Sequence, residues 1–160
     1  MARLIHTLEP IFDKDSRVLI LGSFPSSASR KAGFYYSHPQ NRFWRIISYL
    51  TKTEPIPFTI DDKKWMLIKN RIALWDIINS CNTNGSSDSC LTDIIPADLS
   101  LIFDNSDIKQ IFANGDKAYK LSKKYASVEV KKLPSTSSAN AAYSLEKLIN
   151  KWSVVLEAVL

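Results

Sequence analysis

Four short apolar stretches, separated by segments of a different periodicity, dominate the pattern of hydrophobic and polar positions. Residues 16–23 (SRVLILGS), 71–78 (RIALWDII) and 108–115 (IKQIFANG) are nearly continuous apolar runs, and residues 127–135 (SVEVKKLPS) alternate more. Continuous apolar runs of this length are typical of strands that are buried on both faces of a parallel sheet. The pattern therefore predicts four strands.

Helical periodicity fills the segments between and after these runs. Residues 116–126 and 143–160 are amphipathic and follow turn-forming residues, with Asn140 or Ser144 as the candidate N-cap of the last helix. One more helix is predicted from apolar residues at helical spacing, which are Phe43, Ile46, Ile47 and Leu50. Because strands alternate with helices, we expect a three-layer α/β/α sandwich around a central, mostly parallel four-stranded sheet.

The remaining sequence shows no sign of a second domain. A chain of 160 residues with 45% hydrophobic residues can form one sizeable core, so we expect a single domain over residues 1–160. Residues 78–99 (INSCNTNGSSDSCLTDIIPADL) are polar and lack a repeat, and we interpret them as a long surface loop.

Two serine-rich segments follow predicted strands. In an open α/β sheet, ligands bind at the carboxyl ends of the strands, which is where GSFPSS (22–27) and LPSTSSAN (133–140) are expected to lie. Their hydroxyls and backbone amides can position phosphates, although an ordinary turn or a helix cap explains each of them equally simply. The first segment matches neither a Walker loop nor GxGxxG, so no nucleotide cofactor is expected.

A third segment, GFYYSHPQNRFW (33–44), joins aromatic rings to a single asparagine. Phe34, Tyr35 and Tyr36 offer rings on which a base can stack, although at least one of the two tyrosines is expected to pack in the core, as is Phe43. Asn41 is either an ordinary helix N-cap or a carboxamide that points into the cleft and orients water.

Taken together, these segments resemble a known enzyme family. GSFPSSASRKAGFYYSHPQNRFWRII, ALWDII, IFANGDKAYKLSKKY and LPSTSSANA, in order between about Glu9 and Ala142, are similar to the DNA-deoxyinosine (hypoxanthine-DNA) glycosylases, a branch of the uracil-DNA glycosylase superfamily. The wider superfamily carries an Asn or Asp shortly after the first strand, where this chain has Ser23 and Phe24, a departure that the deoxyinosine branch shares. The last motif departs further, with Ser138 in place of a family proline, which implies a softer loop.

The resemblance implies a set of site residues. Asn41 matches the family's catalytic Asn, and we assign it to orienting a water below C1′, with its amide oxygen also facing the sugar. His38 and Asp76 are the general-base alternatives, against a structural turn for His38 and a local cap or ion pair for Asp76. We expect the base pocket to contain Gly22, Ser23, Phe24, Phe34, Tyr35, His38, Asp76 and Asn114. We expect DNA contacts from Pro25, Ser26, Ser27, Arg42, Ser135, Thr136, Ser137, Ser138 and Asn140.

The hydrogen-bonding edge of the base predicts a second role for Asp76. Hypoxanthine carries a proton at N1 and adenine does not, so a carboxylate would accept a hydrogen bond from hypoxanthine and repel the N1 lone pair of adenine. Asp76, which follows Trp75 at the end of the second predicted strand, is placed for this role.

Charge and cysteine content narrow the partners. The formal net charge of +5 favours a polyanion without naming it. Cys81 and Cys90 lack the spacing of a metal site, so we expect no metal. We expect the protein to lie in the cytoplasm, at the nucleoid, with both thiols reduced. The sequence has no export signal and no membrane-spanning run, so we expect no membrane partner.

The predicted function is hydrolysis of the N-glycosidic bond of deoxyinosine in DNA, which releases hypoxanthine during base-excision repair. We expect a monomeric, monofunctional glycosylase because no lysine within the motifs is placed to form a Schiff base, Lys31 being the nearest. The alternatives are a uracil, mismatch or xanthine DNA glycosylase of the same fold, and a non-catalytic nucleic-acid-binding protein. A hydrolase of free deoxyinosine monophosphate is a weaker alternative.

Overall fold

A four-stranded parallel sheet forms the centre of the computed structural model, which describes residues 2–83 and 92–160. Its order is β3 (Ile72–Asp76), β2 (Val18–Gly22), β6 (Gln110–Asn114) and β7 (Val130–Leu133). Val18 pairs with Ile72, and Gly22 pairs with Asp76. The four predicted strands are all present, and the expected three-layer α/β fold is confirmed.

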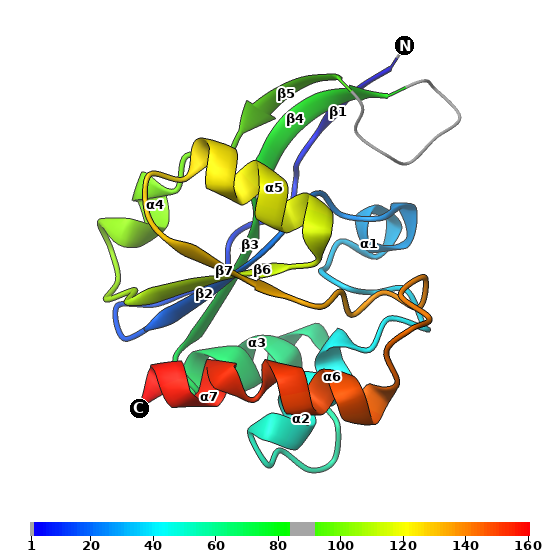
Figure 1. The fold of residues 1–160 in the computed structure, drawn as a ribbon, viewed down its shortest axis with the longest axis vertical. Helices are drawn as coiled ribbons and strands as arrows, with labels where there is room; N and C mark the ends of the chain where they lie inside the picture. Colours follow the sequence, from blue (N-terminus) through cyan, green and yellow to red (C-terminus); the bar gives the residue numbers. More distant parts are fainter. Residues whose placement is uncertain (1, 84–91) are drawn as a thin grey trace.

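Both faces of this sheet are covered, which is why its strands are nearly continuous apolar runs. In β2, Val18 and Ile20 face one core cluster, whereas Leu19 and Leu21 face the other. The first cluster is covered by α2 (Phe43–Leu50), α3 (Ile60–Lys69), α6 (Leu145–Trp152) and α7 (Val154–Val159) (Figure 1). The second is covered by α4 (Ser100–Phe103) and α5 (Asp116–Tyr125).

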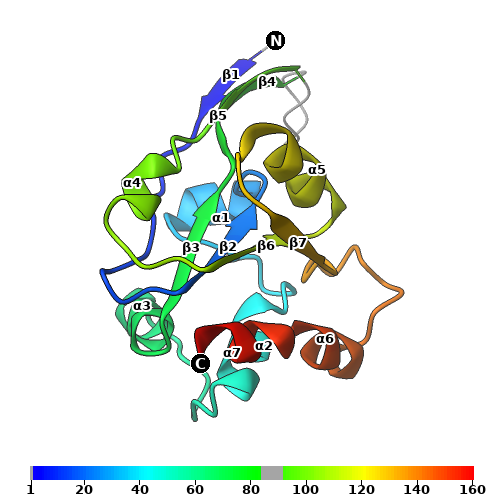
Figure 2. The ribbon, with the colours of Figure 1, turned by 60° about the vertical axis from the view of Figure 1, so that its left-hand side comes forward.

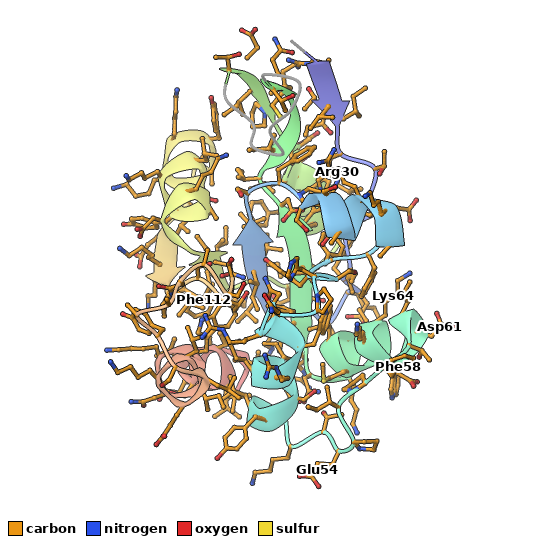
Figure 3. All side chains as sticks on the ribbon, turned by 90° about the vertical axis from the view of Figure 1, so that its right-hand side faces the viewer. Arg30, Glu54, Phe58, Asp61, Lys64 and Phe112 are labelled. Carbon is orange, nitrogen blue, oxygen red and sulfur yellow. The ribbon has the colours of Figure 1, made fainter. Side chains whose placement is uncertain are left out.

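Burial sorts the side chains as this layering requires. Phe112 of β6 lies inside the molecule with 2% of its surface exposed, whereas Phe58, in the segment before α3, is 93% exposed (Figure 3). The predicted C-terminal helix is present as two helices, α6 and α7, because the helix is interrupted at Ser153. Ser144 caps α6 by accepting a hydrogen bond from the Lys147 amide at 3.2 Å, so the Ser144 alternative is confirmed.

A second sheet corrects the interpretation of residues 78–99 as a loop. In it, β4 (Ile78–Thr83) pairs antiparallel with β1 (Ala2–Ile5) and β5 (Thr92–Pro96). Its strands were not predicted because their side chains are mostly polar: β4 buries Ser80, Cys81 and Thr83 instead of a run of large apolar groups. Cys81 is disulfide-bonded, so the expectation of a reduced thiol is wrong for this residue, and Cys90 lies outside the described residues.

The carboxyl ends of the four parallel strands meet at one edge of the central sheet. From β2 the chain crosses to β3 on one side, and the later strand β6 lies on the other side of β2, so the strand order reverses there. Such a switch point opens a crevice beyond the strand ends. The loop after β7 and helix α1 (Ser27–Ala32) flank this edge (Figures 1 and 2). Among residues 2–83 and 92–160, no helix is long and apolar enough to span a membrane.

Candidate active site

A cavity of about 300 Å³ opens at these strand ends and gathers most of the predicted site residues. It draws on the ends of β2, β3 and β6, the turn after β2, the segment before α2 and the loop after β7. The predicted residues that line it are Gly22, Ser23, Phe24, Pro25, Ser26, Tyr35, His38, Asn41, Asp76, Asn114, Ser135, Thr136, Ser137 and Ser138. Ser29 and Tyr36 also line it, whereas Ser27, Phe34, Arg42 and Asn140 do not.

Asn41 is held by a hydrogen-bond chain that crosses the cavity. Its Oδ1 accepts from the amide of Phe43, the first residue of α2, at 2.9 Å, and from the Thr136 hydroxyl at 2.9 Å. Thr136 Oγ1 in turn accepts from Asn114 Nδ2 at 3.1 Å, and the Thr136 amide donates to Asn114 Oδ1 at 3.1 Å. Thr136 is fully buried. The N-cap of α2 is Arg42 rather than Asn41, and Asn41 lies at the cavity, as the cleft alternative expects.

This chain fixes which way the Asn41 carboxamide points. A backbone N–H can only donate, so the atom that meets the Phe43 amide must be the oxygen, and the Thr136 amide fixes Asn114 in the same way. Both lone pairs of Asn41 Oδ1 are then used, and Nδ2 makes no hydrogen bond to any described residue. The expectation that the amide oxygen faces the sugar is corrected: Asn41 presents a donor.

Asp76 lines the cavity and is held from behind by His6, which the sequence reading missed. His6 Nε2 lies 2.8 Å from Asp76 Oδ2, and the two side chains are only 4% and 5% exposed. His6 follows β1, and its amide donates to the Asn79 carbonyl at 2.7 Å, so the second sheet places it. A single histidine near the N-terminus carries no local signal of this contact, because its partner is 70 residues away.

Gly22 allows two oxygens to approach the end of β2 closely. A Cβ at this position would lie 2.4 Å from Asp76 Oδ1 and 2.9 Å from the Tyr36 hydroxyl. Neither distance is compatible with a side chain at position 22. The missing side chain of Gly22 therefore lets the Asp76 carboxylate and the Tyr36 hydroxyl approach the same point at the end of β2.

The two tyrosines and Phe34 differ in how they pack. Phe34 stacks on Trp44 in the core with ring centroids 5.5 Å apart, and the Tyr35 hydroxyl donates to the Glu9 carbonyl at 2.6 Å. Tyr36 stacks on Phe43 at 4.3 Å with an interplanar angle of 22°. The structure does not bring Phe34 to the cavity, so the expected base stacking by Phe34 loses its geometric basis; Phe24 and Tyr36 offer rings there instead.

Burial shapes the protonation of both tyrosines. Desolvation, followed by the nearby Asp76 carboxylate, raises the pKa of the Tyr35 and Tyr36 phenols well above the ordinary value of about 10. Both hydroxyls therefore keep their protons throughout the physiological range and can act as donors.

His38 lies at the exposed rim of the cavity, in the turn before α2. Its Nδ1 accepts from the Gln40 amide at 3.1 Å, and its carbonyl accepts from the Asn41 amide at 3.0 Å. Because Nδ1 is an acceptor, the neutral ring carries its proton on Nε2 and has no nitrogen left to take a proton from water. The geometry favours the structural alternative for His38.

Arg42 holds the loop after β7 through hydrogen bonds to its carbonyls. Its Nη2 donates to the carbonyls of Ser137 at 2.7 Å and Asn140 at 3.2 Å, its Nη1 to that of Tyr143, and its Nε to that of Thr136 at 3.4 Å. The guanidinium is thus engaged with carbonyls of this loop, and contact between Arg42 and phosphate stays a prediction. Asn140 has a similar bracing role, since its Nδ2 donates to the Ser135 carbonyl at 3.0 Å.

The serines of both loops act first as local acceptors. Ser135 Oγ accepts from the Ser137 amide at 3.1 Å, and Ser137 Oγ accepts from the Ala139 amide at 3.2 Å. Across the cavity, Ser26 Oγ caps α1 by accepting from the Ser29 amide at 3.2 Å. Neither the Ser135 nor the Ser137 hydroxyl donates to a described residue, so both can donate to a ligand in the cavity that they line. Ser27 is the first residue of α1.

No group of three or more His, Cys, Asp or Glu within the described parts of the chain is arranged to hold a metal ion. The polar groups of the cavity are one carboxylate, carboxamides and hydroxyls, together with the rim imidazole. This set can bind a neutral heterocycle by hydrogen bonds and can position a water. It contains no lysine that could form a Schiff base.

Comparisons with known proteins identify the family of this chain. The Uracil DNA glycosylase superfamily profile matches residues 9–156. Proteins named Hypoxanthine DNA glycosylase from Methanosarcina acetivorans and Methanosarcina barkeri are 32% and 29% identical, over 91% and 90% of this chain and 93% and 92% of their own length. The solution NMR structure of a candidate uracil DNA glycosylase from Methanosarcina acetivorans superposes with a TM-score of 0.80 at 30% identity, covering 96% of this chain and 97% of that one. The chain therefore belongs to the uracil DNA glycosylase superfamily.

Proposed function

We propose that this protein is a monofunctional DNA glycosylase that releases hypoxanthine from deoxyinosine in DNA. The observation that carries the proposal is the Asn41 carboxamide, which is fixed by Thr136 and Phe43 at a cavity beyond the strand ends. The two Methanosarcina relatives, which bear the name Hypoxanthine DNA glycosylase, support the choice of base.

The cavity suits a base that has left the DNA stack. Enzymes that act on a base in duplex DNA extrude it into a pocket, and a mispaired base costs least to extrude. The loop around Ser135 to Ser138 would meet the DNA on one side of the opening, and the Pro25-Ser26 turn would meet the flanking phosphates on the other. Phe24 is the half-buried ring in the cavity against which the purine would lie.

Asn41 would act by donating a hydrogen bond. When the bond between C1′ and N9 breaks, its electron pair leaves with the base and positive charge develops on the sugar. A water oxygen then adds to C1′, and the proton that the water loses neutralises the departing hypoxanthine anion. With Oδ1 occupied, Asn41 Nδ2 can hold that water by its oxygen but cannot take its proton. Catalysis would then rest on positioning and on stabilising the departing base.

Asp76 would read the base. Its Oδ1 faces Gly22 at the cavity, whereas Oδ2 is bound by His6. Oδ1 would accept a hydrogen bond from N1–H of hypoxanthine and would repel the N1 lone pair of adenine. If Asp76→Asn left the preference for hypoxanthine over adenine unchanged in a cleavage assay, this role would be lost.

The other expected properties remain part of the proposal. We infer a monofunctional reaction because the cavity has no lysine among the described residues and Lys31 is exposed on α1. We also infer a monomer that acts on deaminated bases in DNA, in the cytoplasm at the nucleoid, without a metal or a membrane partner.

The test is alkali-dependent strand cleavage of a duplex with one deoxyinosine. Asn41→Ala should reduce the single-turnover rate by about a hundredfold or more, the usual effect of removing a positioned donor. Asn150→Ala, an exposed asparagine on α6, is the matched control and should retain the wild-type rate. Cleavage that survives Asn41→Ala would move catalysis to another residue.

The same assay separates the alternatives. Duplexes with uracil or xanthine measure the lesion spectrum, because uracil N3–H and xanthine N1–H could also donate to Asp76. Binding without cleavage of any of these duplexes would favour a non-catalytic nucleic-acid-binding protein. Cleavage of free deoxyinosine monophosphate but not of DNA would favour a small-molecule hydrolase.

A further inference from the structure

The Tyr36 hydroxyl is the polar group in the cavity that the proposed function leaves unexplained. It is buried and has no partner at hydrogen-bonding distance in the described part of the protein, although the Asn114 carboxamide lies near enough to offset part of the rise in the pKa of the phenol, and it belongs to a residue that lines the cavity. An unpartnered buried hydroxyl costs about 1–3 kcal/mol, so each instance calls for a reason.

Two further features show that the Tyr36 side chain is held in place. Its backbone φ is +50°, in the left-handed region that a bulky residue adopts only when its surroundings impose it. Its ring is stacked on Phe43, which is fully buried at the start of α2. The chain thus accepts a strained backbone and an unsatisfied hydroxyl at one position, a combination typical of functional sites.

The hydroxyl is also placed beside the acceptor that reads the base. Both oxygens lie close to the point that a Cβ at position 22 would occupy, 2.4 Å from it for Asp76 Oδ1 and 2.9 Å for the Tyr36 hydroxyl. Because burial keeps the Tyr36 phenol protonated, the pair consists of one donor and one acceptor. Hypoxanthine presents the complementary pair on adjacent atoms, since N1–H donates and O6 accepts.

We propose that Tyr36 and Asp76 together read the lactam edge of the base: Tyr36 donates to O6 while Asp76 Oδ1 accepts from N1–H. His6 acts as a positioning residue, because its bond to Asp76 Oδ2 leaves Oδ1 for the base. This inference rests on the proposed function. It adds Tyr36 and His6 to the specificity determinants, and it predicts that uracil, with adjacent N3–H and O4 groups, is read by the same two atoms.

The test compares two otherwise identical duplexes, one with deoxyinosine and one with deoxynebularine, whose purine base lacks both O6 and the N1 proton. Tyr36→Phe should slow hypoxanthine release about tenfold and leave purine release unchanged, because only hypoxanthine has an O6 to lose its donor. Tyr49→Phe, on the exposed side of α2, is the matched control and should change neither rate. An inosine-to-nebularine rate ratio that Tyr36→Phe leaves unaltered would overturn the inference.

Binding gives a second measurement that does not require cleavage. In an Asn41→Ala background, Kd values for the same two duplexes should give an inosine preference that Tyr36→Phe lowers about tenfold. His6→Leu should lower the same preference, and His6→Gln, which keeps a donor for Asp76 Oδ2, should restore much of it. A preference unaffected by Tyr36→Phe and His6→Leu refutes the edge reading, whereas an intact preference pattern in a protein that cleaves nothing refutes only the glycosylase activity.

Discussion

At the scale of single residues, Thr136 governs the orientation of Asn41. Thr136→Val keeps the shape of the side chain but removes both the donor to Asn41 Oδ1 and the acceptor for Asn114 Nδ2. The carboxamide can then rotate, and we expect the single-turnover rate on deoxyinosine to fall by between about ten- and a hundredfold. Thr136→Ser keeps the hydroxyl and should recover most of the rate. Kd for the lesion duplex, measured by fluorescence anisotropy, should change little; a rate that falls only in proportion to binding would contradict this role.

Tyr36 should show opposite effects on stability and on activity. Tyr36→Phe removes a buried hydroxyl that has no partner among the described residues, so we expect the free energy of unfolding to rise by about 1 kcal/mol. Urea unfolding measures this difference. Tyr35→Phe is the contrast, because it removes the bond to the Glu9 carbonyl and should lower stability by about 1 kcal/mol. A loss of stability in Tyr36→Phe would mean that the hydroxyl has a partner in solution.

The residue scale also shows what the sequence could predict of the site. Asn41, Asp76 and the serine-rich loops follow strand ends or lie in a distinctive motif, so their place at the cavity was predictable. The polarity of Asn41 was not, because it depends on Thr136, 95 residues away. His6 was missed for the same reason: only the pairing of β1 with β4 carries it to Asp76.

At the scale of elements, one side chain ties α2 to the loop after β7. Arg42 precedes α2 and donates to carbonyls of Thr136, Ser137, Asn140 and Tyr143. Lysine lacks the guanidinium fork, so Arg42→Lys should loosen this loop. We expect Kd for the lesion duplex to rise about tenfold and amide exchange at residues 137–143 to accelerate. Arg45→Lys, an exposed change on the same helix, is the control. Unchanged exchange in Arg42→Lys would show that the loop is held by other contacts.

The elements differ in how readily they are predicted from the sequence. The strands β2, β3 and β6 are buried on both faces and so consist mainly of apolar residues, with the polar residues at their ends, which makes them recognisable. The strand β4 packs beside the main core through Ser80, Cys81 and Thr83, and its alternation of small polar groups is also typical of a loop. Helix α1 has six residues and is set by the Ser26 cap rather than by an apolar face.

At the scale of the whole molecule, the topology explains why distant residues share one site. Gly22, Asp76 and Asn114 are each the last residue of a parallel strand, and the loop containing Thr136 follows the fourth. The carboxyl ends of parallel strands lie at one edge of the sheet, so the strand order alone brings these residues to the same cavity. The loops then supply orientation through Thr136 and Arg42, and the second sheet supplies His6.

The free energy of unfolding should fall at alkaline pH, because Tyr35 and Tyr36 have buried phenols. The raised pKa of Tyr35 and Tyr36 means that the folded protein keeps two protons which the unfolded chain releases above pH 10. Their contribution to stability is complete below about pH 10 and is lost as pH rises further, by about 1.4 kcal/mol per pH unit for each tyrosine. Urea unfolding between pH 9 and 11.5 measures this slope. Above pH 10, the slope of Tyr36→Phe should be shallower than that of the wild type by one tyrosine's share, and equal slopes would mean that the Tyr36 phenol reaches solvent in the folded protein.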